Sequence, residues 1–396
     1  MHTSARCDSA DFVPDSLGAR RKVPRVEAQE YAGPMQDRDG SRALGGLAAS
    51  GEPAELDELG ELDELDRGVV HALQVHPRAS WALVGEVLGV DPVTAARRWR
   101  RLEQAGLAWV TAYPRLTDAR IVVTGVIEVD TEPGAAEDVA RALADDPAVP
   151  NVKLTAGGRD VVASVQTRTL DELSRLSGSL FRPIPGVRAT RTHVSTGLPT
   201  EGSRWRLRSL DAAQTGRLEQ EARPPAPTGS TAPARWDSLD ARLLELLSVD
   251  GRMSLRDLSA ASGAPLTTVR RRVASLLASR LLLRCDLARP LSGWPLSAVY
   301  FASVPGQYLE ETSRVLSQVP EVRSCAITAG PHNLVVDVWL RTLHDVHTFE
   351  AHLSRRLPRL TVADRSVVLR TVKHMGRLLD RGGRSVGVVP LRHLEA

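Results

Sequence analysis

The chain has 396 residues, of which 42% are hydrophobic and 25% charged, with a formal net charge of +3. This composition is that of a soluble globular protein with room for two to four domains, and a basic surface for nucleic acid would have to be local. No apolar run approaches the roughly 20 residues that span a bilayer. The first residues lack the apolar core of a secretory signal, and the three cysteines form no CxxC pair. We therefore expect a cytoplasmic chain with no membrane partner, disulfide framework or zinc finger.

The chain starts with a segment that has no periodic pattern and continues into a helical module. Residues 1–55 mix Gly, Ser, Pro, Arg and Asp, and we predict a disordered tail there. We place a first helical domain at 56–112. Within it, residues 78–89 predict a scaffold helix with a turn glycine, capped by Ser80. Asp91-Pro92 predicts the start of a second helix that runs to about Gln104.

Helical spacing separates two faces of this second helix. Ala95, Trp99 and Leu102 share one stripe, which should pack on the scaffold helix. The opposite face carries the candidates for contact with DNA: Thr94, Arg97, Arg98 and Arg101. Arginine forks bind phosphates or read guanine edges in the major groove, and threonine near a helix start can contact phosphate. A basic, solvated helix face is the alternative interpretation.

A mixed segment follows at 118–208, and a Pro-rich and Ser/Thr-rich linker at 209–236. The mixed segment predicts the order βαββαβ, the split ferredoxin-like arrangement. Its expected elements are a strand at 121–129, a helix at 132–143, a hairpin with strands at 152–154 and 161–165, a helix at 170–180 and a strand at 185–194.

The second half of the chain repeats this plan. Six residues of the first helical domain recur 174 positions later, namely Asp66, Arg78, Gly89, Arg97, Leu102 and Leu107 as Asp240, Arg252, Gly263, Arg271, Leu276 and Leu281. We place the second helical domain at 237–288, the second mixed domain at 295–376 and a C-terminal tail at 377–396. After Ala264-Pro265, the second exposed helix face carries Thr268, Arg270, Arg271 and Arg272. Two such helices after a glycine turn make a merely solvated face the weaker interpretation.

These residues resemble the Lrp/AsnC family of feast/famine transcription regulators. The likeness rests on Leu62-Asp63, Arg78, Gly89, Arg98 and Leu102-Glu103, and on their second copy. The resemblance implies an α+β chain in which two winged helix-turn-helix domains alternate with two ferredoxin-like ligand-binding domains. It also implies double-stranded DNA and a small effector, usually an amino acid, as partners.

By the same resemblance, the effector lies near a Gly/Asp turn at a domain interface, for which the candidates are Thr155, Gly157 and Asp160. A glycine allows close backbone approach, and Asp160 could take an α-amino group. An ordinary hairpin turn is the equal alternative. The second copy has Asn333 in place of the acidic residue, and there we favour the plain turn.

The duplicated regulatory segments predict an intramolecular pseudo-dimer, with a higher homo-oligomer as a further possibility. An enzyme of the same fold, a siroheme decarboxylase, is the alternative function. We understand that group to carry an Arg-His motif on the first regulatory strand, whereas 121–129 and 298–304 contain no histidine. We expect no catalytic residues, no cofactor and no metal site, with His344 and His347 as solvated helix residues.

Overall fold

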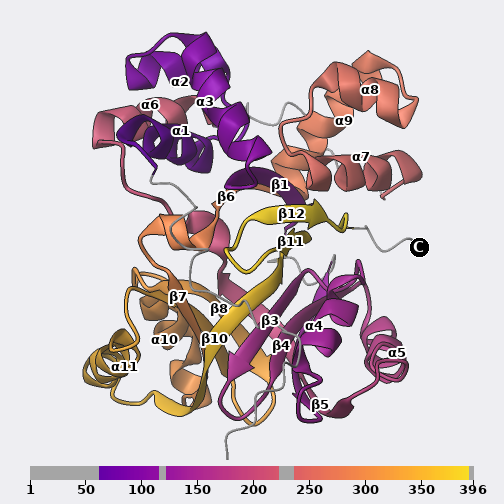
Figure 1. Ribbon diagram of the computed structural model, residues 1–396, viewed down its shortest axis with the longest axis vertical. Coiled ribbons are helices and arrows are strands. Elements are labelled where there is room, and N and C mark those ends of the chain that lie inside the picture. Colours follow the sequence, from indigo (N-terminus) through magenta and orange to yellow (C-terminus); the bar gives the residue numbers. More distant parts are fainter. Residues whose placement is uncertain (1–61, 116–121, 223–235, 392–396) are drawn as a thin grey trace, which may run out of the picture. The chain divides into compact units, whose positions relative to one another are not determined.

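The computed structural model describes residues 62–115, 122–222 and 236–391 (Figure 1). These residues belong to one compact unit, Glu52–Ala396. The predicted tail at 1–55, the segment 223–235 of the predicted linker and Ile121 of the first predicted strand lie outside the described ranges. No helix within those ranges is long and apolar enough to cross a membrane.

The first helical head consists of α1 (Glu64–Val75), α2 (Trp81–Leu88) and α3 (Pro92–Gln104). Local capping chemistry sets its boundaries. The side chain of Ser80 accepts a hydrogen bond from Leu83 N, and Gly89 ends α2 with a φ of 66°. Asp91 caps α3, and Pro92 occupies the first turn, where its missing N–H costs nothing.

The second helical head repeats the arrangement with α7 (Ser238–Val249), α8 (Leu255–Ser262) and α9 (Leu266–Ser279). Ser254 caps α8, and Gly263 ends it with a φ of 70°. Pro265 stands at the N-cap of α9 without a side-chain bond, so α9 begins less firmly than α3.

A two-stranded antiparallel ribbon joins the heads. It is formed by β1 (Ala108–Pro114) and β6 (Leu281–Leu287), with Ala108 opposite Leu287 and Pro114 opposite Leu281. Each head buries residues from the other head's strand: Cys285 and Leu287 lie in the first core and Ala112 in the second. Burial of these apolar groups makes the two heads one packing unit.

Each α/β copy has the order βαββαβ. The first contains β2 (Val123–Thr131), α4 (Ala136–Ala144), β3 (Asn151–Ala156), β4 (Val161–Thr167), α5 (Leu170–Ser179) and β5 (Val187–Thr200). The second contains β7 (Leu296–Ser303), α10 (Leu309–Leu316), β8 (Val322–Ala329), β9 (Leu334–Leu340), α11 (Asp345–Arg356) and β10 (Thr361–His374).

The two α/β copies pair with each other within the chain. Strand β5 lies antiparallel to β8, and β10 lies antiparallel to β3, so two four-stranded sheets are joined along both edges. The helices pack against the outer faces and form a separate core in each copy (Figure 1). The inner faces meet around Val126, Leu198, Val299, Phe301 and Val335. This alternation between faces is the period-two pattern of strands.

Two segments predicted to lack regular structure form a helix and two strands, because their apolar side chains pack against other parts of the chain. Part of the predicted linker 209–236 forms α6 (Ala212–Ala222), whose Leu218 is fully buried in the first head. Part of the predicted tail 377–396 forms β11 (Arg377–Leu379) and β12 (Ser385–Val388). Met375 and Gly376 both have positive φ, which matches a tight hairpin turn between β10 and β11.

Candidate functional site

The helices α3 and α9 each bury one stripe and expose the opposite side. In α3 the buried residues are Ala95, Trp99 and Leu102, and in α9 they are Val269, Val273 and Leu276, as the helical spacing predicts. The stripe fixes each helix by burial of apolar area and leaves the other face in solvent.

Exposed cations occupy equivalent positions on these open faces. Arg97 and Arg271, 174 positions apart, are both exposed and make no hydrogen bond or ion pair with a described residue. Arg100 on α3 and Arg270 on α9 are likewise exposed and have no hydrogen bond or ion pair with a described residue. Thr94 and Thr268 are half-buried in the first turns of their helices. Guanidinium groups without an internal partner are available to phosphates.

Arg98 and Arg272 have a different environment from the one that we predicted. Nη1 of Arg98 lies 2.5 Å from the Asp63 carboxylate and 3.4 Å from that of Asp66. Nη2 of Arg272 lies 2.6 Å from Asp237, and its Nη1 lies 3.3 Å from Asp240.

The carboxylates that hold these arginines stand at the starts of the first helices, so each pair ties α3 to α1 or α9 to α7. Both arginine side chains are only 28% exposed. The pKa of Asp63 is lowered by the hydrogen bond from Asp66 N and by Arg98. These ion pairs give Arg98 and Arg272 a positioning role within the heads, and their contact with DNA stays a prediction. Arg101 also pairs with Asp66 but is 59% exposed.

The candidate effector turn uses its polar atoms internally. Thr155 Oγ1 donates to the carbonyl oxygen of Arg159 at 2.9 Å. Asp160 Oδ2 accepts bonds from the backbone N–H and the hydroxyl of Thr131, at 2.7 and 3.0 Å. Gly157 has a φ of 126°, which only glycine adopts without strain. These contacts stabilise the turn.

The second copy keeps equivalent hydrogen bonds in its turn, with an amide in place of the acid, although Gly330 does not share the positive φ of Gly157. The side chain of Asn333 accepts a bond from Val304 N and donates one to Val304 O, at 3.0 and 2.7 Å. Thr328 donates to His332 O at 2.7 Å. The loss of the carboxylate therefore leaves the hairpin intact.

Sequence reasoning missed a buried polar centre where the two copies meet. Arg159 binds Glu128 and Asp364, both at 2.5 Å, and lies 4.0 Å from the ring centroid of Phe301. His193 lies 2.5 Å from Glu128. Burial raises the pKa of Glu128, but His193 and Arg159 together bring it below its ordinary value. The first copy supplies Glu128, Arg159 and His193, whereas the second supplies Phe301 and Asp364, so the two copies are complementary here.

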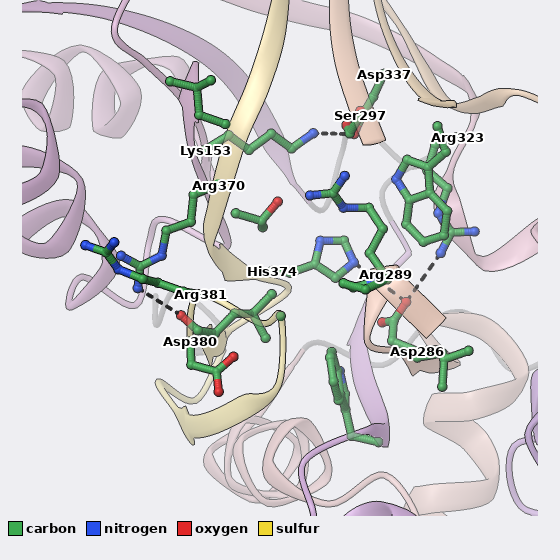
Figure 2. A pocket seen from close by; sticks show the side chains of 18 residues that line it. Lys153, Asp286, Arg289, Ser297, Arg323, Asp337, Arg370, His374, Asp380 and Arg381 are labelled. Atoms are coloured by element: carbon green, nitrogen blue, oxygen red, sulfur yellow. Dashed lines mark hydrogen bonds and ion pairs between the residues drawn. The ribbon is translucent and has the colours of Figure 1, made fainter. Parts of the chain in front are cut away.

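A second missed cluster lies between the ribbon and the sheets. Arg284 Nη2 lies 2.6 Å from Asp286, and Arg323 Nη2 lies 3.4 Å from the same carboxylate. Burial would raise the pKa of Asp286, but Arg284 and His374 depress it strongly. Burial lowers the pKa of Arg323 to about 9, which leaves it charged at neutral pH. This cluster borders a cavity, the junction pocket, lined by side chains from several strands (Figure 2).

Comparison with known proteins agrees with the duplication. The AsnC-type helix-turn-helix domain matches residues 62–103 and 237–277. The Lrp/AsnC ligand binding domain matches residues 124–204 and 297–378. Helix-turn-helix heads attached to ligand-binding domains define a class of transcriptional regulator. Within that class, the chain belongs to the Lrp/AsnC family, and it carries both domains of the family twice.

Individual relatives align with about a third of this chain. A helix-turn-helix-type transcriptional regulator of Pyrococcus horikoshii is 28% identical over 145 residues, covering 36% of this chain and 90% of the relative. The leucine-responsive regulatory protein of Salmonella typhimurium is 28% identical over 140 residues, covering 34% of this chain and 84% of that protein.

A solved structure matches most of the length. The siroheme decarboxylase NirDL, in co-complex with an iron-uroporphyrin III analogue, superposes with a TM-score of 0.51. The match covers 79% of this chain and 93% of NirDL at 10% sequence identity. At this identity the likeness is one of fold.

Proposed function

We propose that this chain is a sequence-specific DNA-binding regulator in which α3 and α9 are the recognition helices of winged helix-turn-helix heads. The observation that carries the proposal is the equivalent exposure of Arg97 and Arg271, which have no partner within the described ranges. Guanidinium groups at this position of a recognition helix reach phosphates or base edges in the major groove. A regulator of this kind acts on DNA in the cytoplasm.

The test is a gel shift with the full chain. Genomic fragments are offered with excess non-specific DNA at several salt concentrations. A specific fragment should be retained, and its affinity should fall steeply with salt because phosphate binding releases counterions. Absence of any retained fragment at low salt would contradict the proposal.

The two recognition faces differ, which favours an asymmetric operator. Arg100 and Arg101 of α3 correspond to Ala274 and Ser275 of α9, whereas Arg270 has Ala96 as its counterpart. Because the two α/β copies pair within the chain, one chain would act as a pseudo-dimer with two unlike heads. An ideal palindrome that outcompetes every asymmetric site would argue against this.

For the effector, we retain Thr155, Gly157 and Asp160 as the family-based candidates and an amino acid as the ligand class. Ligand binding there would require Asp160 to exchange its bonds with Thr131 for an α-amino group. In an Asp160→Asn variant the side-chain oxygen can still accept the Thr131 bonds, but the charge is lost. The effector response should disappear while DNA binding without effector persists. A normal response would leave the turn with a structural role only.

A tetrapyrrole-carboxylate decarboxylase is the second candidate, favoured by the likeness to NirDL across 79% of the chain. The test is a titration with an iron tetrapyrrole, followed by its Soret absorption. A shifted band at stoichiometric protein would support this candidate, and an unshifted band would exclude it.

A further inference from the structure

The junction pocket lies where the ribbon between the heads meets the α/β sheets (Figure 2). Its walls come from β1 through Trp109, from β6 through Asp286, from β10 through Arg370 and from the β11–β12 turn through Asp380 and Arg381. Its volume is about 80 Å³. A neighbouring cavity of about 150 Å³ between the sheets shares four of its lining residues: Lys153, Arg323, Asp337 and His374. Since one water needs roughly 10–15 Å³ on this measure, the space fits a small metabolite.

Positive charge exceeds negative charge around the pocket. Five cationic side chains line it, against three carboxylates: Lys153, Arg289, Arg323, Arg370 and Arg381 against Asp286, Asp337 and Asp380. Asp337 pairs with Lys153 and Asp286 with Arg323, and Asp380 accepts a bond from Arg384 N. Arg370 and Arg381 both pair with Glu137, at 2.8 and 3.6 Å, so the excess is one positive charge. Burial lowers the pKa of His374, so it adds no charge at neutral pH. The remaining positive charge favours an anion.

Several residues that line this cavity have buried donors without an acceptor. Arg323 is 6% exposed, yet its Nε and Nη1 have no hydrogen-bond acceptor among the described residues. The same holds for Nε1 of Trp109 and Nε of Arg370. A buried donor without an acceptor is costly, and such groups are normally satisfied by water or a ligand. Donors outnumber the one unsatisfied acceptor here, Asp286 Oδ2, so the complementary ligand is rich in acceptors.

Apolar groups complete the wall. Trp109, Trp339, Leu369 and Leu379 line the pocket beside the cations. Arg323 lies 4.1 Å from the ring centroid of Trp339 and 5.0 Å from that of Trp205, which holds its guanidinium in place. Pre-organised arginine is the usual receptor for a carboxylate, whereas the indoles and leucines suit an aliphatic body.

We propose that the junction pocket binds a small organic carboxylate with an aliphatic side chain, at a site distinct from the Gly/Asp turn. This inference rests on the proposed regulatory function only in assigning the ligand a role in DNA binding. The ligand carboxylate faces the guanidinium groups, and its apolar part lies against the tryptophan rings.

The β11–β12 hairpin gives such a ligand a route to both heads. Asp380, Arg381 and Gly383 of this hairpin line the pocket. Ser385 N donates to Gly106 O of the first head at 2.8 Å, and Leu391 N donates to Ser248 Oγ of the second at 3.1 Å. A ligand that orders the hairpin therefore changes how firmly the heads are held.

The experiment is tryptophan fluorescence and calorimetry on the full chain, since Trp109 and Trp339 both line the site. L-leucine, its oxo acid and L-leucinamide are the probes. Both carboxylates should bind and change the emission, and leucinamide, which lacks the carboxylate, should not. Binding of the oxo acid alone would assign the site to oxo acids, and binding of leucine alone to amino acids.

Two variants locate the binding. One variant is Arg370→Met and the other is Arg381→Met, at an exposed position. Each should weaken carboxylate binding about tenfold, which is the usual effect of losing one charged hydrogen bond. Arg314→Met, an exposed arginine on α10 outside the pocket, is the matched control. Failure of both carboxylates to bind, equal binding of leucinamide, or unchanged affinity in both pocket variants would overturn the proposal.

DNA affinity is measured separately, with and without ligand. Carboxylate binding by a chain that does not bind DNA would preserve the pocket and remove the regulator function. DNA binding without carboxylate binding would preserve the regulator function and overturn the proposal for the pocket.

Discussion

Arg78 and Arg252, 174 positions apart, each bind the turn that contains the other. Arg78 donates to Gly251 O and Met253 O at 2.6 and 2.9 Å. Arg252 donates to Pro77 O and Ala79 O at the same two distances. The exchange is reciprocal, and each guanidinium uses its planar fork on two carbonyl oxygens. Together with the ribbon of β1 and β6, this pair fixes one head against the other.

Loss of either arginine should loosen the pair of heads. Arg78→Ala or Arg252→Ala removes two charged hydrogen bonds to partly buried carbonyl groups, and we expect each to lower the free energy of unfolding by about 2–3 kcal/mol. The measurement is urea unfolding of the full chain. Arg97→Ala, an exposed arginine of the same head, should leave unfolding unchanged. A double variant no less stable than either single one would show that the two forks act as a unit.

The recognition helices allow a comparison between two kinds of arginine. Arg97→Ala with Arg271→Ala should keep the unfolding free energy and weaken DNA binding. The slope of log affinity against log salt should fall by roughly one for each lost phosphate contact. Gel shifts at several salt concentrations measure this. Unchanged affinity would remove both residues from the interface.

The matched variants are Arg98→Ala with Arg272→Ala. Here the loss should appear first in stability, at about 1–2 kcal/mol per head, because Asp63 and Asp237 lose their ion-pair partners at the helix starts. DNA binding at a temperature where the heads stay folded should change less than in the first pair. If these variants instead kept full stability and lost DNA binding, our assignment of a positioning role would be wrong.

Local chemistry made much of the fold predictable. Ser80, Gly89 and Asp91-Pro92 set helix ends through their own side chains and φ angles, so the sequence pattern placed α2 and α3 well. The 174-residue offset then transferred the same plan to the second head.

Features that depend on distant residues were not predictable in this way. Arg98 looked like Arg97 on the helix face, but its carboxylate Asp63 lies 35 positions earlier and reaches it only in the folded head. Arg159 binds Asp364, 205 positions away. The short strands β11 and β12 show too little alternation to reveal a hairpin, although Gly376 and Gly383 mark its turns.

Acidic pH should weaken the attachment of the segment before α6. His71 is buried, and its Nδ1 accepts bonds from Ser209 N and Leu210 N at 3.1 and 2.9 Å. Burial, with a contribution from Arg206, lowers the pKa of His71 to about 4 from 6.5. Between pH 4 and 6.5, His71 is protonated in the unfolded chain and neutral in the folded chain. The stabilisation is thus complete above pH 6.5 and is lost as the pH falls toward 4, by on the order of 3 kcal/mol.

The measurement is the unfolding free energy as a function of pH for the wild type and His71→Asn. Asparagine can accept the same bonds but does not titrate, so its curve should be flatter in this range. His347→Asn, on the exposed side of α11, should keep the wild-type slope. Parallel curves for wild type and His71→Asn would rule out His71 as the source of the pH dependence.

Alanine substitutions at two glycines distinguish the strain at a helix end from the contact with the β11–β12 hairpin. Gly89 and Gly106 have φ values of 66° and 67°, so alanine at either position pays the same strain of the left-handed region, about 1–2 kcal/mol. A Cβ at Gly89 would meet nothing within 4 Å, whereas one at Gly106 would collide with the carbonyl oxygen of Ser385. Gly106→Ala should therefore cost more than Gly89→Ala and should also displace β12 from the first head.

Hydrogen exchange at the Ser385 amide measures that displacement, since this N–H is bonded to Gly106 O in the folded chain. Exchange should accelerate in Gly106→Ala and not in Gly89→Ala. If the hairpin transmits ligand binding from the junction pocket, Gly106→Ala should still bind the carboxylate but lose its effect on DNA affinity. An unchanged ligand effect on DNA, with the amide exposed, would mean that the signal reaches the heads through β1 and β6, whose residues Trp109 and Asp286 also line the pocket.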